Sequence, residues 1–186
     1  MKAGTALATD SRLLQVKEII ITNGGFKRGD FVLASGKKSN FYFNTKTATL
    51  NPEGISLIAE VIYDRVKDLG IASIGGLELG SIPIATAVAQ LSFRQGNPIP
   101  AFWVRDVPKD HGDKTKFEGT LKPGSKVVVV DDVATTGRSI IKAINEVEAR
   151  GCKIERIIVV LDREEGAKDN LRQYDYESLL KASDFK

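Results

Sequence analysis

Residues 126–139, KVVVVDDVATTGRS, limit the possible folds of this chain more than any other stretch. The four consecutive valines at 127–130 are too apolar and too β-branched for an exposed strand. They predict a central strand of a parallel sheet that is covered on both faces. Two adjacent carboxylates, Asp131 and Asp132, follow this strand, and a short turn leads from them into an amphipathic helix. Open α/β sheets bind ligands at such a junction, so we expect a ligand site here.

The turn after these acids has the chemistry of a phosphate site. A helix N-terminus favours an anion because its first N–H groups are free and the helix dipole is positive there. Thr135, Thr136 and Ser139 add hydroxyl donors, and Gly137 lets the backbone approach a ligand closely. The paired acids would repel a phosphate, but they suit neighbouring sugar hydroxyls or a hydrated metal ion. The stretch therefore predicts a site for a ribose 5-phosphate; the alternative is an ordinary buried strand followed by a capped helix.

Length and composition restrict the class of protein. A chain of 186 residues predicts one domain, and 42% hydrophobic with 27% charged residues is typical of a soluble globular protein. The net charge of +3 is too weak to indicate a nucleic-acid or membrane partner. A single cysteine, Cys152, fits a reducing cytoplasm. No apolar run is long enough to span a membrane and the N-terminus lacks a signal-peptide core, so we expect a cytoplasmic protein.

From about residue 70 to 165 the chain alternates between strand and helix patterns. The expected strands are residues 71–74, 101–104, 127–130 and 154–161, with an outer strand at 174–180. Helices are expected after Pro83 and from the threonine-rich turn to about Arg150. Such alternation predicts a parallel sheet flanked by helices with right-handed crossovers. We therefore assign the chain to the α/β class, as one domain with its core sheet at about 70–165.

About the first 50 residues do not alternate in this way. A capped helix is expected at about 10–22, and the strand-like pieces 31–33 and 41–43 predict a hairpin. Asn51 is expected to cap the next helix, with Pro52 as its first residue. We expect this part of the chain to form mainly a hood over the carboxyl edge of the sheet.

Residues 105–119 form a long polar segment without periodicity, directly after a predicted strand. The segment contains Arg105, Lys109 and the single histidine of the chain, His111. A long irregular loop in a compact domain is commonly functional or disordered. Its cations can stabilise a diphosphate leaving group, and a flexible loop can close over a substrate. The segment thus predicts a flexible catalytic loop, with a solvated surface loop as the alternative.

Three further features carry weaker signals. Arg163 follows a predicted strand, where an arginine can bind a carboxylate through two parallel hydrogen bonds; the alternative is an ordinary surface arginine. Tyr42 and Phe43 fit a stacking platform for a base, although the core is the commoner place for such residues. The two glycines at 75–76 can form an anion nest with the N–H groups of residues 76–80.

Several stretches together resemble the orotate phosphoribosyltransferases. They are LASGKKSNFYFN, GGLELGSIPIATAVA, FWVRDVPKDHG with FEG, VVVVDDVATTGRS and LDREEGA, spread over residues 25–166. The resemblance implies a type I phosphoribosyltransferase-like fold and transfer of ribose 5-phosphate from phosphoribosyl diphosphate (PRPP) to N1 of orotate. The products would be orotidine 5′-monophosphate and diphosphate, in pyrimidine (UMP) biosynthesis. It also implies Mg²⁺ as cofactor and a homodimer in which each flexible loop reaches the partner's active site.

The same resemblance implies the site residues. The PRPP site would comprise Asp131, Asp132, Val133, Ala134, Thr135, Thr136, Gly137, Arg138 and Ser139, with Arg105, Lys109 and His111 from the loop. The three loop residues would be catalytic, Lys109 foremost, and Lys46 is a secondary candidate. Orotate would contact Thr135, Arg163, Tyr42 and Phe43, with its carboxylate on Arg163. Mg²⁺ would be held mainly through PRPP, with the two acids taking part through water.

The chain also departs from the family pattern. Many members have lysine where this chain has Asp106, and an acid beside a polyanion is unfavourable, so Asp106 should point away or weaken diphosphate binding. In one branch of the family a lysine replaces Ala34 and a Tyr-Lys pair replaces Leu79 and Gly80. Two alternatives remain open: a phosphoribosyltransferase for another base, or a nucleotide-sensing RNA-binding regulator on the same fold. A purine has no carboxylate for Arg163, and a regulator would need a concentrated basic face.

Overall fold

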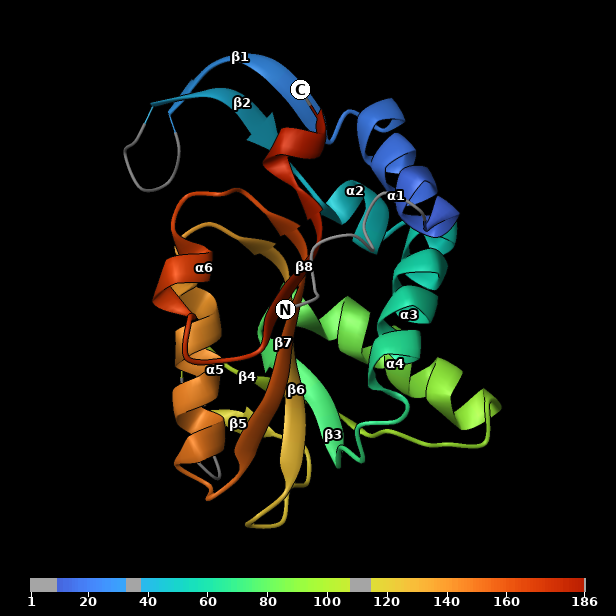
Figure 1. The fold of residues 1–186 in the computed structure, drawn as a ribbon, viewed down its shortest axis with the longest axis vertical. Coiled ribbons are helices and arrows are strands. Elements are labelled where there is room, and N and C mark those ends of the chain that lie inside the picture. The colour runs from blue at the N-terminus through green and yellow to red at the C-terminus, as the bar shows by residue number, and fades with distance from the viewer. Residues whose placement is uncertain (1–9, 33–37, 108–114, 186) are drawn as a thin grey trace, which may run out of the picture.

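The structure is a computed structural model and describes residues 10–32, 38–107 and 115–185. Its centre is a six-stranded sheet in the order β5-β4-β3-β6-β7-β8 (Figure 1). The strands are β3 (Ser73–Leu77), β4 (Ala101–Val104), β5 (Phe117–Glu118), β6 (Lys126–Ala134), β7 (Lys153–Asp162) and β8 (Tyr176–Lys181). All neighbours are parallel except β4 and β5. The α/β class, the central place of the valine strand and the outer strand are therefore confirmed.

Helices cover both faces of this sheet (Figure 1). They are α1 (Ser11–Thr22), α2 (Lys46–Thr49), α3 (Pro52–Val66), α4 (Ser81–Arg94), α5 (Arg138–Glu148) and α6 (Ala167–Asn170), with a 3₁₀ helix at Ala182–Phe185. The valines of β6 alternate between the faces: Val128 and Val130 pack in a core with α3 and α4, whereas Val127 and Val129 pack with α5. This two-sided burial explains why the strand carries only valines between the exposed Lys126 at its start and Asp131.

Strand β3 begins and ends later than predicted, and this corrects the interpretation of its two glycines. Gly75 and Gly76 lie inside the strand, not in a turn beyond it. A Cβ on Gly75 would lie 2.0 Å from the carbonyl oxygen of Phe102, and one on Gly76 would lie 2.1 Å from that of Val130. The glycines therefore allow close packing of neighbouring strands, and they do not form an anion nest. Helix α4 also begins earlier than predicted, at Ser81.

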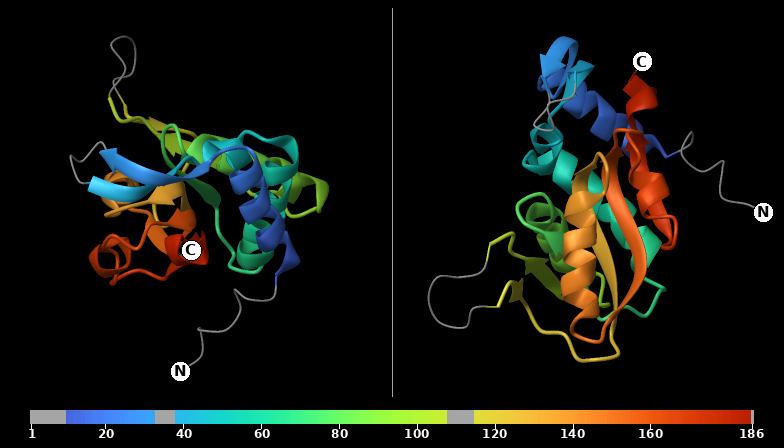
Figure 2. Two further views of the ribbon diagram at one scale, coloured as in Figure 1. Left: turned by 90° about the horizontal axis from the view of Figure 1, so that it is seen from above. Right: turned by 90° about the vertical axis from the view of Figure 1, so that its left-hand side faces the viewer.

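The N-terminal part of the chain forms the hood. Strands β1 (Phe26–Val32) and β2 (Lys38–Phe43) form an antiparallel hairpin, whose first strand starts five residues before the predicted 31–33. The hairpin lies over the end of the sheet at which β6 and β7 finish (Figures 1 and 2). Phe43 packs against Phe26 and Phe185, with ring centroids 5.1 Å apart in both pairs. Apolar packing thus ties the hairpin to the C-terminal 3₁₀ helix.

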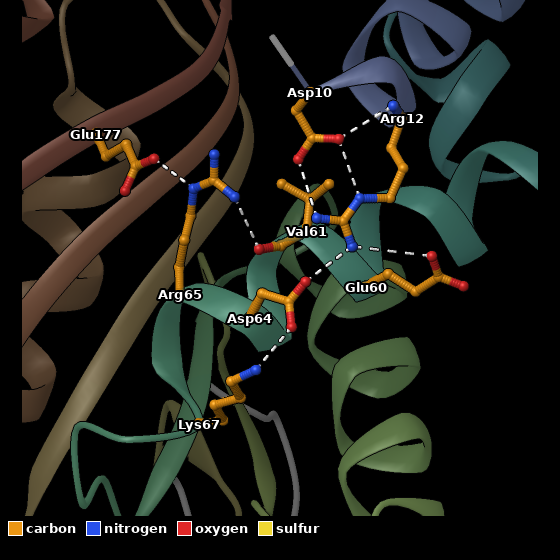
Figure 3. Close-up of polar contacts among 8 residues, drawn as sticks. All are labelled: Asp10, Arg12, Glu60, Val61, Asp64, Arg65, Lys67 and Glu177. Atoms are coloured by element: carbon orange, nitrogen blue, oxygen red, sulfur yellow. Dashed lines mark hydrogen bonds and ion pairs between the residues drawn. The ribbon is translucent and has the colours of Figure 1, made fainter. Parts of the chain in front are cut away.

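Polar contacts fix α1 on α3 (Figure 3). Arg12 donates through Nε and Nη2 to Asp10, at 3.0 and 2.9 Å, and through Nη1 to Asp64 at 2.8 Å. Asp10 also caps α1 by accepting from the backbone N–H of Arg12, and Asn51 caps α3 by accepting from two backbone N–H groups, as predicted. Hydrogen bonds from Arg12 and then Lys67 lower the pKa of Asp64. The guanidinium therefore joins the first helix to the body of the protein.

Two further observations concern possible membrane-spanning helices and the predicted irregular segment. Within the described ranges, no helix is long and apolar enough to cross a membrane. The predicted irregular segment 105–119 contains a short strand that the sequence analysis did not expect, since β5 pairs with β4 through Phe117 and Glu118. Residues 108–114 of that segment lie outside the described residues.

Candidate active site

Strand β6 carries the two acids to the carboxyl edge of the sheet. The strand continues to Ala134, so Asp131 and Asp132 lie within its last part and not after it, as the sequence analysis had placed them. Both are only 6% exposed. Asp131 accepts from the hydroxyl of Ser139 at 2.7 Å and from the backbone N–H of Asp132 at 2.9 Å. Burial, followed by the charge of Asp132, raises the pKa of Asp131 to about 7.

Asp132 is held by the hood. Its Oδ2 accepts from the hydroxyl of Thr45 at 3.0 Å and from the ammonium group of Lys46 at 2.8 Å. Burial alone would lower the pKa of Lys46, but the hydrogen bond and charge of Asp132 outweigh it and raise that pKa. The resemblance had marked Lys46 as a secondary candidate. Thr45, which is 1% exposed, carried no sequence signal.

The turn between β3 and α4 closes the acids from a third side. A Cβ added to Gly80 would lie 2.3 Å from Oδ1 of Asp132 and 2.5 Å from Oδ1 of Asp131. Only glycine leaves room for both carboxylates here, and no other residue fits without a shift of the acids. The sequence analysis treated Gly80 only as a departure from one branch of the family. The sequence feature that could have indicated this role is the position of Gly80 in the GLELGS loop, directly before the helix at Ser81.

The turn after β6 and the start of α5 have the backbone geometry that the predicted anion site requires. Gly137 has a φ of +79° and directly precedes α5, which has no side-chain cap and no acid in its first turn. Its free N–H groups and the dipole suit a phosphate. The carbonyl of Thr135 accepts from the N–H of Ala167 at 3.1 Å, and that of Thr136 from the amide of Asn170 at 2.9 Å. Residues of helix α6 therefore stabilise this turn. The sequence analysis did not predict this contact.

The remaining predicted members of this motif have different surroundings. Val133 and Ala134 are the last two residues of β6, and Ala134 is buried. Arg138 is the first residue of α5 and is exposed. Val133 and Ala134 therefore contribute backbone, whereas the hydroxyl and carboxyl groups of the site come from their neighbours.

Arg163 follows β7 and is buried, so the alternative of an ordinary surface arginine is wrong. It is 8% exposed, its backbone N–H donates to the carbonyl of Ala134 at 2.9 Å, and its Nε donates to Glu165 at 2.8 Å. Asp162 stabilises the same turn by accepting from Tyr176 at 2.9 Å and from the N–H of Glu164 at 2.7 Å. The guanidinium thus lies inside the molecule, at the same edge as the acids.

The hood brings aromatic rings to this guanidinium. The Arg163 Cζ lies 6.0 Å from the ring centroids of both Phe41 and Phe43. Phe43 is buried, whereas Tyr42 is 40% exposed and packs against Phe31 at 5.7 Å. Neighbouring residues of a strand face opposite ways, so the structure brings Phe43 but not Tyr42 to Arg163. The second ring near Arg163 is that of Phe41, which the sequence analysis did not name as a site residue.

Of the predicted loop residues, only Arg105 is described; Lys109 and His111 lie outside the described residues. One guanidinium nitrogen of Arg105 lies 3.6 Å from Glu118, and the residue lines a hollow of about 180 Å³ with Lys116 and Lys142. No contact within the described part of the chain joins Arg105 to the two acids. Asp106, expected to point away from the polyanion, pairs with Lys142 of α5 at 2.5 Å.

Comparisons with known proteins agree with this geometry. The family described as phosphoribosyl transferase domain matches residues 46–185. An orotate phosphoribosyltransferase of Rhodopseudomonas palustris is 46% identical over 172 residues, which cover 89% of this chain and 92% of the relative. One of Methanocaldococcus jannaschii is 47% identical over 154 residues, covering 83% and 84%. The chain belongs to the orotate phosphoribosyltransferase family.

Solved orotate phosphoribosyltransferases share the fold described above. The Mycobacterium tuberculosis enzyme in complex with PRPP superposes with a TM-score of 0.74 at 28% identity, over 94% of this chain and 98% of that one. The resemblance inferred from sequence is therefore confirmed, as are the type I fold and the assignment to orotate rather than to another base.

The described residues of this orotate phosphoribosyltransferase also bear on Mg²⁺. Among them, no three His, Cys, Asp or Glu side chains converge as a metal-binding cluster. Asp131 and Asp132 are the carboxylates at the site, and one oxygen of Asp132 is already taken by Thr45 and Lys46. Mg²⁺ commonly keeps several waters and binds through one or two carboxylates together with substrate phosphates. The donor set fits an ion of that kind, held chiefly by the substrate.

Proposed function

We propose that this orotate phosphoribosyltransferase binds PRPP across the junction of β6 and α5. The 5′-phosphate lies on the N–H groups and hydroxyls of residues 135–139, and Asp131 and Asp132 accept hydrogen bonds from the ribose hydroxyls. The observation that carries this assignment is the pair of buried acids directly before an uncapped helix N-terminus. Anion donors and diol acceptors then lie side by side, in the order of phosphate and ribose in the substrate.

In the reaction, N1 of orotate gives up its proton and forms a bond to the anomeric carbon of PRPP, while the bond from that carbon to diphosphate breaks and diphosphate leaves with the bonding electron pair. Positive charge develops on the ribose ring and negative charge on the leaving diphosphate. The buried acids are placed to stabilise the ribose, and Arg105, Lys109 and His111 to stabilise the diphosphate. The products are orotidine 5′-monophosphate and diphosphate, as in UMP biosynthesis.

Arg163 binds the orotate carboxylate, with Phe43 beside the base and Thr135 as a further contact. Arg163→Ala should weaken orotate binding at least about tenfold, since a paired buried charge is lost, and leave PRPP binding within about threefold. Isothermal titration with each ligand alone measures both. Arg156→Ala is the matched control, because Arg156 lies on β7, the strand that ends directly before Arg163, and pairs with Asp175 at 2.7 Å. An equal loss of both ligands in the Arg163 variant would contradict the assignment.

Lys109 is proposed as the principal catalytic cation of the loop. Lys109→Ala should lower kcat about a hundredfold or more, as expected for removal of an electrostatic stabiliser, while the melting temperature stays unchanged. Unchanged turnover would remove the loop from the chemistry. Asp106 is compatible with this role, because its charge is balanced by Lys142 and does not oppose the diphosphate.

Mg²⁺ is proposed as the cofactor. Asp131 and Asp132 would hold it through water, with PRPP supplying most of its ligands, and the ion would neutralise charge on the diphosphate when bound. Activity should be lost in EDTA and restored by Mg²⁺. Activity that persists in metal-free solution would exclude this role.

We further propose a cytoplasmic homodimer in which the loop of each protomer serves the partner's site. Lys109→Ala and Asp131→Asn protomers, each inactive alone, should then regain about a quarter of the parent activity when mixed, because half the dimers are mixed and one of their two sites is intact. No recovery would mean that the loop serves its own site. No nucleic-acid partner is expected at a net charge of +3, and a salt-dependent RNA shift would contradict this.

A further inference from the structure

The hood reaches the acid pair through two consecutive residues. Thr45 and Lys46 stand 87 and 86 positions before Asp132 in the chain, and both donate to the same carboxylate oxygen, Oδ2. The other oxygen, Oδ1, has no N–H donor and no hydroxyl donor among the described residues; it lies on the Gly80 side, 2.3 Å from where a Cβ on that residue would stand, and beside the carboxyl group of Asp131. One oxygen is thus fixed by the protein and the other is left for a ligand.

This arrangement differs from that of Asp131. Ser139 and the N–H of Asp132 hold Asp131, and both belong to the same strand–turn–helix motif. Asp132 takes its side-chain partners from a separate layer of the molecule. Without them, its carboxylate would be buried beside a second carboxylate with no cation in contact, which is costly. The hood is therefore part of the machinery that orients Asp132.

We propose that Lys46, assisted by Thr45, is a positioning residue that holds Oδ2 of Asp132, so that Oδ1 points at a ribose hydroxyl of PRPP. The proposal depends on the proposed binding of the ribose at the acid pair. Lys46 is itself not a phosphate ligand in this scheme, because its ammonium group is already engaged by the carboxylate. A preorganised carboxylate binds its ligand more tightly than one that must first be ordered.

Lys46→Met should raise the KM for PRPP and the inhibition constant of ribose 5-phosphate about tenfold or more, as expected for loss of a charge-assisted contact. The KM for orotate and the inhibition constant of inorganic diphosphate should change less than about twofold, and Lys46→Arg should recover most of the affinity. The matched control is Lys126→Met. Lys126 is the first residue of β6, the strand that carries Asp132, and it pairs with Glu155 at 2.9 Å. Its side chain is 49% exposed, against 51% for Lys46.

A double-mutant cycle separates the possible outcomes. If Lys46 acts through Asp132, then Lys46→Met should add no further loss in an Asp132→Asn background. A full additional loss there, or a weakening of inorganic diphosphate binding, would show that Lys46 contacts the substrate directly and would overturn the proposal. Ribose 5-phosphate affinity that is sensitive to Asp132→Asn but not to Lys46→Met would also overturn it. If Asp132→Asn itself had no effect on ribose 5-phosphate, the proposed ribose site would fail instead.

Discussion

Asp131→Asn should separate what the buried acid contributes to function from what it costs in stability. Asparagine has nearly the same shape as a protonated aspartic acid. Its Oδ1 can accept from the N–H of Asp132, and its amide can donate to the hydroxyl of Ser139, in place of the contacts at 2.9 and 2.7 Å. The variant should therefore fold normally and lose PRPP binding, since a carboxylate acceptor of the ribose is gone.

The size of the stability effect follows from the pKa of Asp131. Burial and the charge of Asp132 raise it from 3.8 to about 7. Because the folded-state pKa is the higher one, the group's stabilising contribution is complete below pH 3.8 and is lost as the pH rises through about 7. At about 1.4 kcal/mol per pKa unit, the parent should lose about 2 to 3 kcal/mol of unfolding free energy through this group between about pH 5 and pH 8. The asparagine variant has no proton to lose there.

Urea unfolding of parent and variant at both pH values, at one fixed protein concentration, measures the effect. The stability difference between variant and parent should shift by about 2 to 3 kcal/mol in favour of the variant between about pH 5 and about pH 8. Titrating groups that do not interact with Asp131 cancel in the difference between the two proteins, so the shift belongs to the pair of Asp131 and Asp132. Asp30→Asn, the same substitution at an exposed position of β1, is the control for removal of a surface carboxylate. A parent–variant difference that is identical at both pH values would refute the assignment of a raised pKa to Asp131.

Three other substitutions test separate parts of the structure. Gly80→Ala places a Cβ 2.3 to 2.5 Å from the two carboxylates and should raise the KM for PRPP at least about tenfold. Steady-state kinetics measures this change, and an unchanged KM would contradict the prediction. Arg12→Ala removes hydrogen bonds to Asp10 and Asp64 and should lower the unfolding free energy by about 1 to 2 kcal/mol, with kcat unaltered. Asn51→Ala should cost about 1 kcal/mol in urea unfolding, whereas Asn51→Ser should retain most of the cap; equal losses would argue against capping.

The parts of the site that could be predicted from sequence are those whose signal is local. The valines of β6, the acids after them and the glycine before α5 stand within eleven consecutive residues, and their order alone implies a buried strand, a turn and an anion site. The capping of α3 by Asn51 was equally local. Arg163 was correctly placed at the end of β7, but its burial depends on the hood, which no pattern near Arg163 reveals.

The parts that could not be predicted depend on contacts between distant segments. Thr45 and Lys46 form an unremarkable polar pair in sequence, and their role follows only when the hood is packed on β6. Gly75 and Gly76 were interpreted as part of an anion nest at the end of the strand. Their actual reason is the approach of Phe102 and Val130, which lie on the two neighbouring strands. The hairpin register likewise depends on pairing across the fold and not on the pattern of β1 alone.

The different partners of the two acids explain why the hood cannot be a passive cover. Asp131 would keep Ser139 and the N–H of Asp132 even if the hood were displaced, because all three residues belong to β6 and α5. Asp132 would lose its hydroxyl and ammonium donors together. Since two buried carboxylates without a cation repel one another, an undocked hood would leave the pair disfavoured as a diol acceptor. If the ribose binds at the acids as proposed, docking of the hood and readiness of that site are coupled through Oδ2 of Asp132.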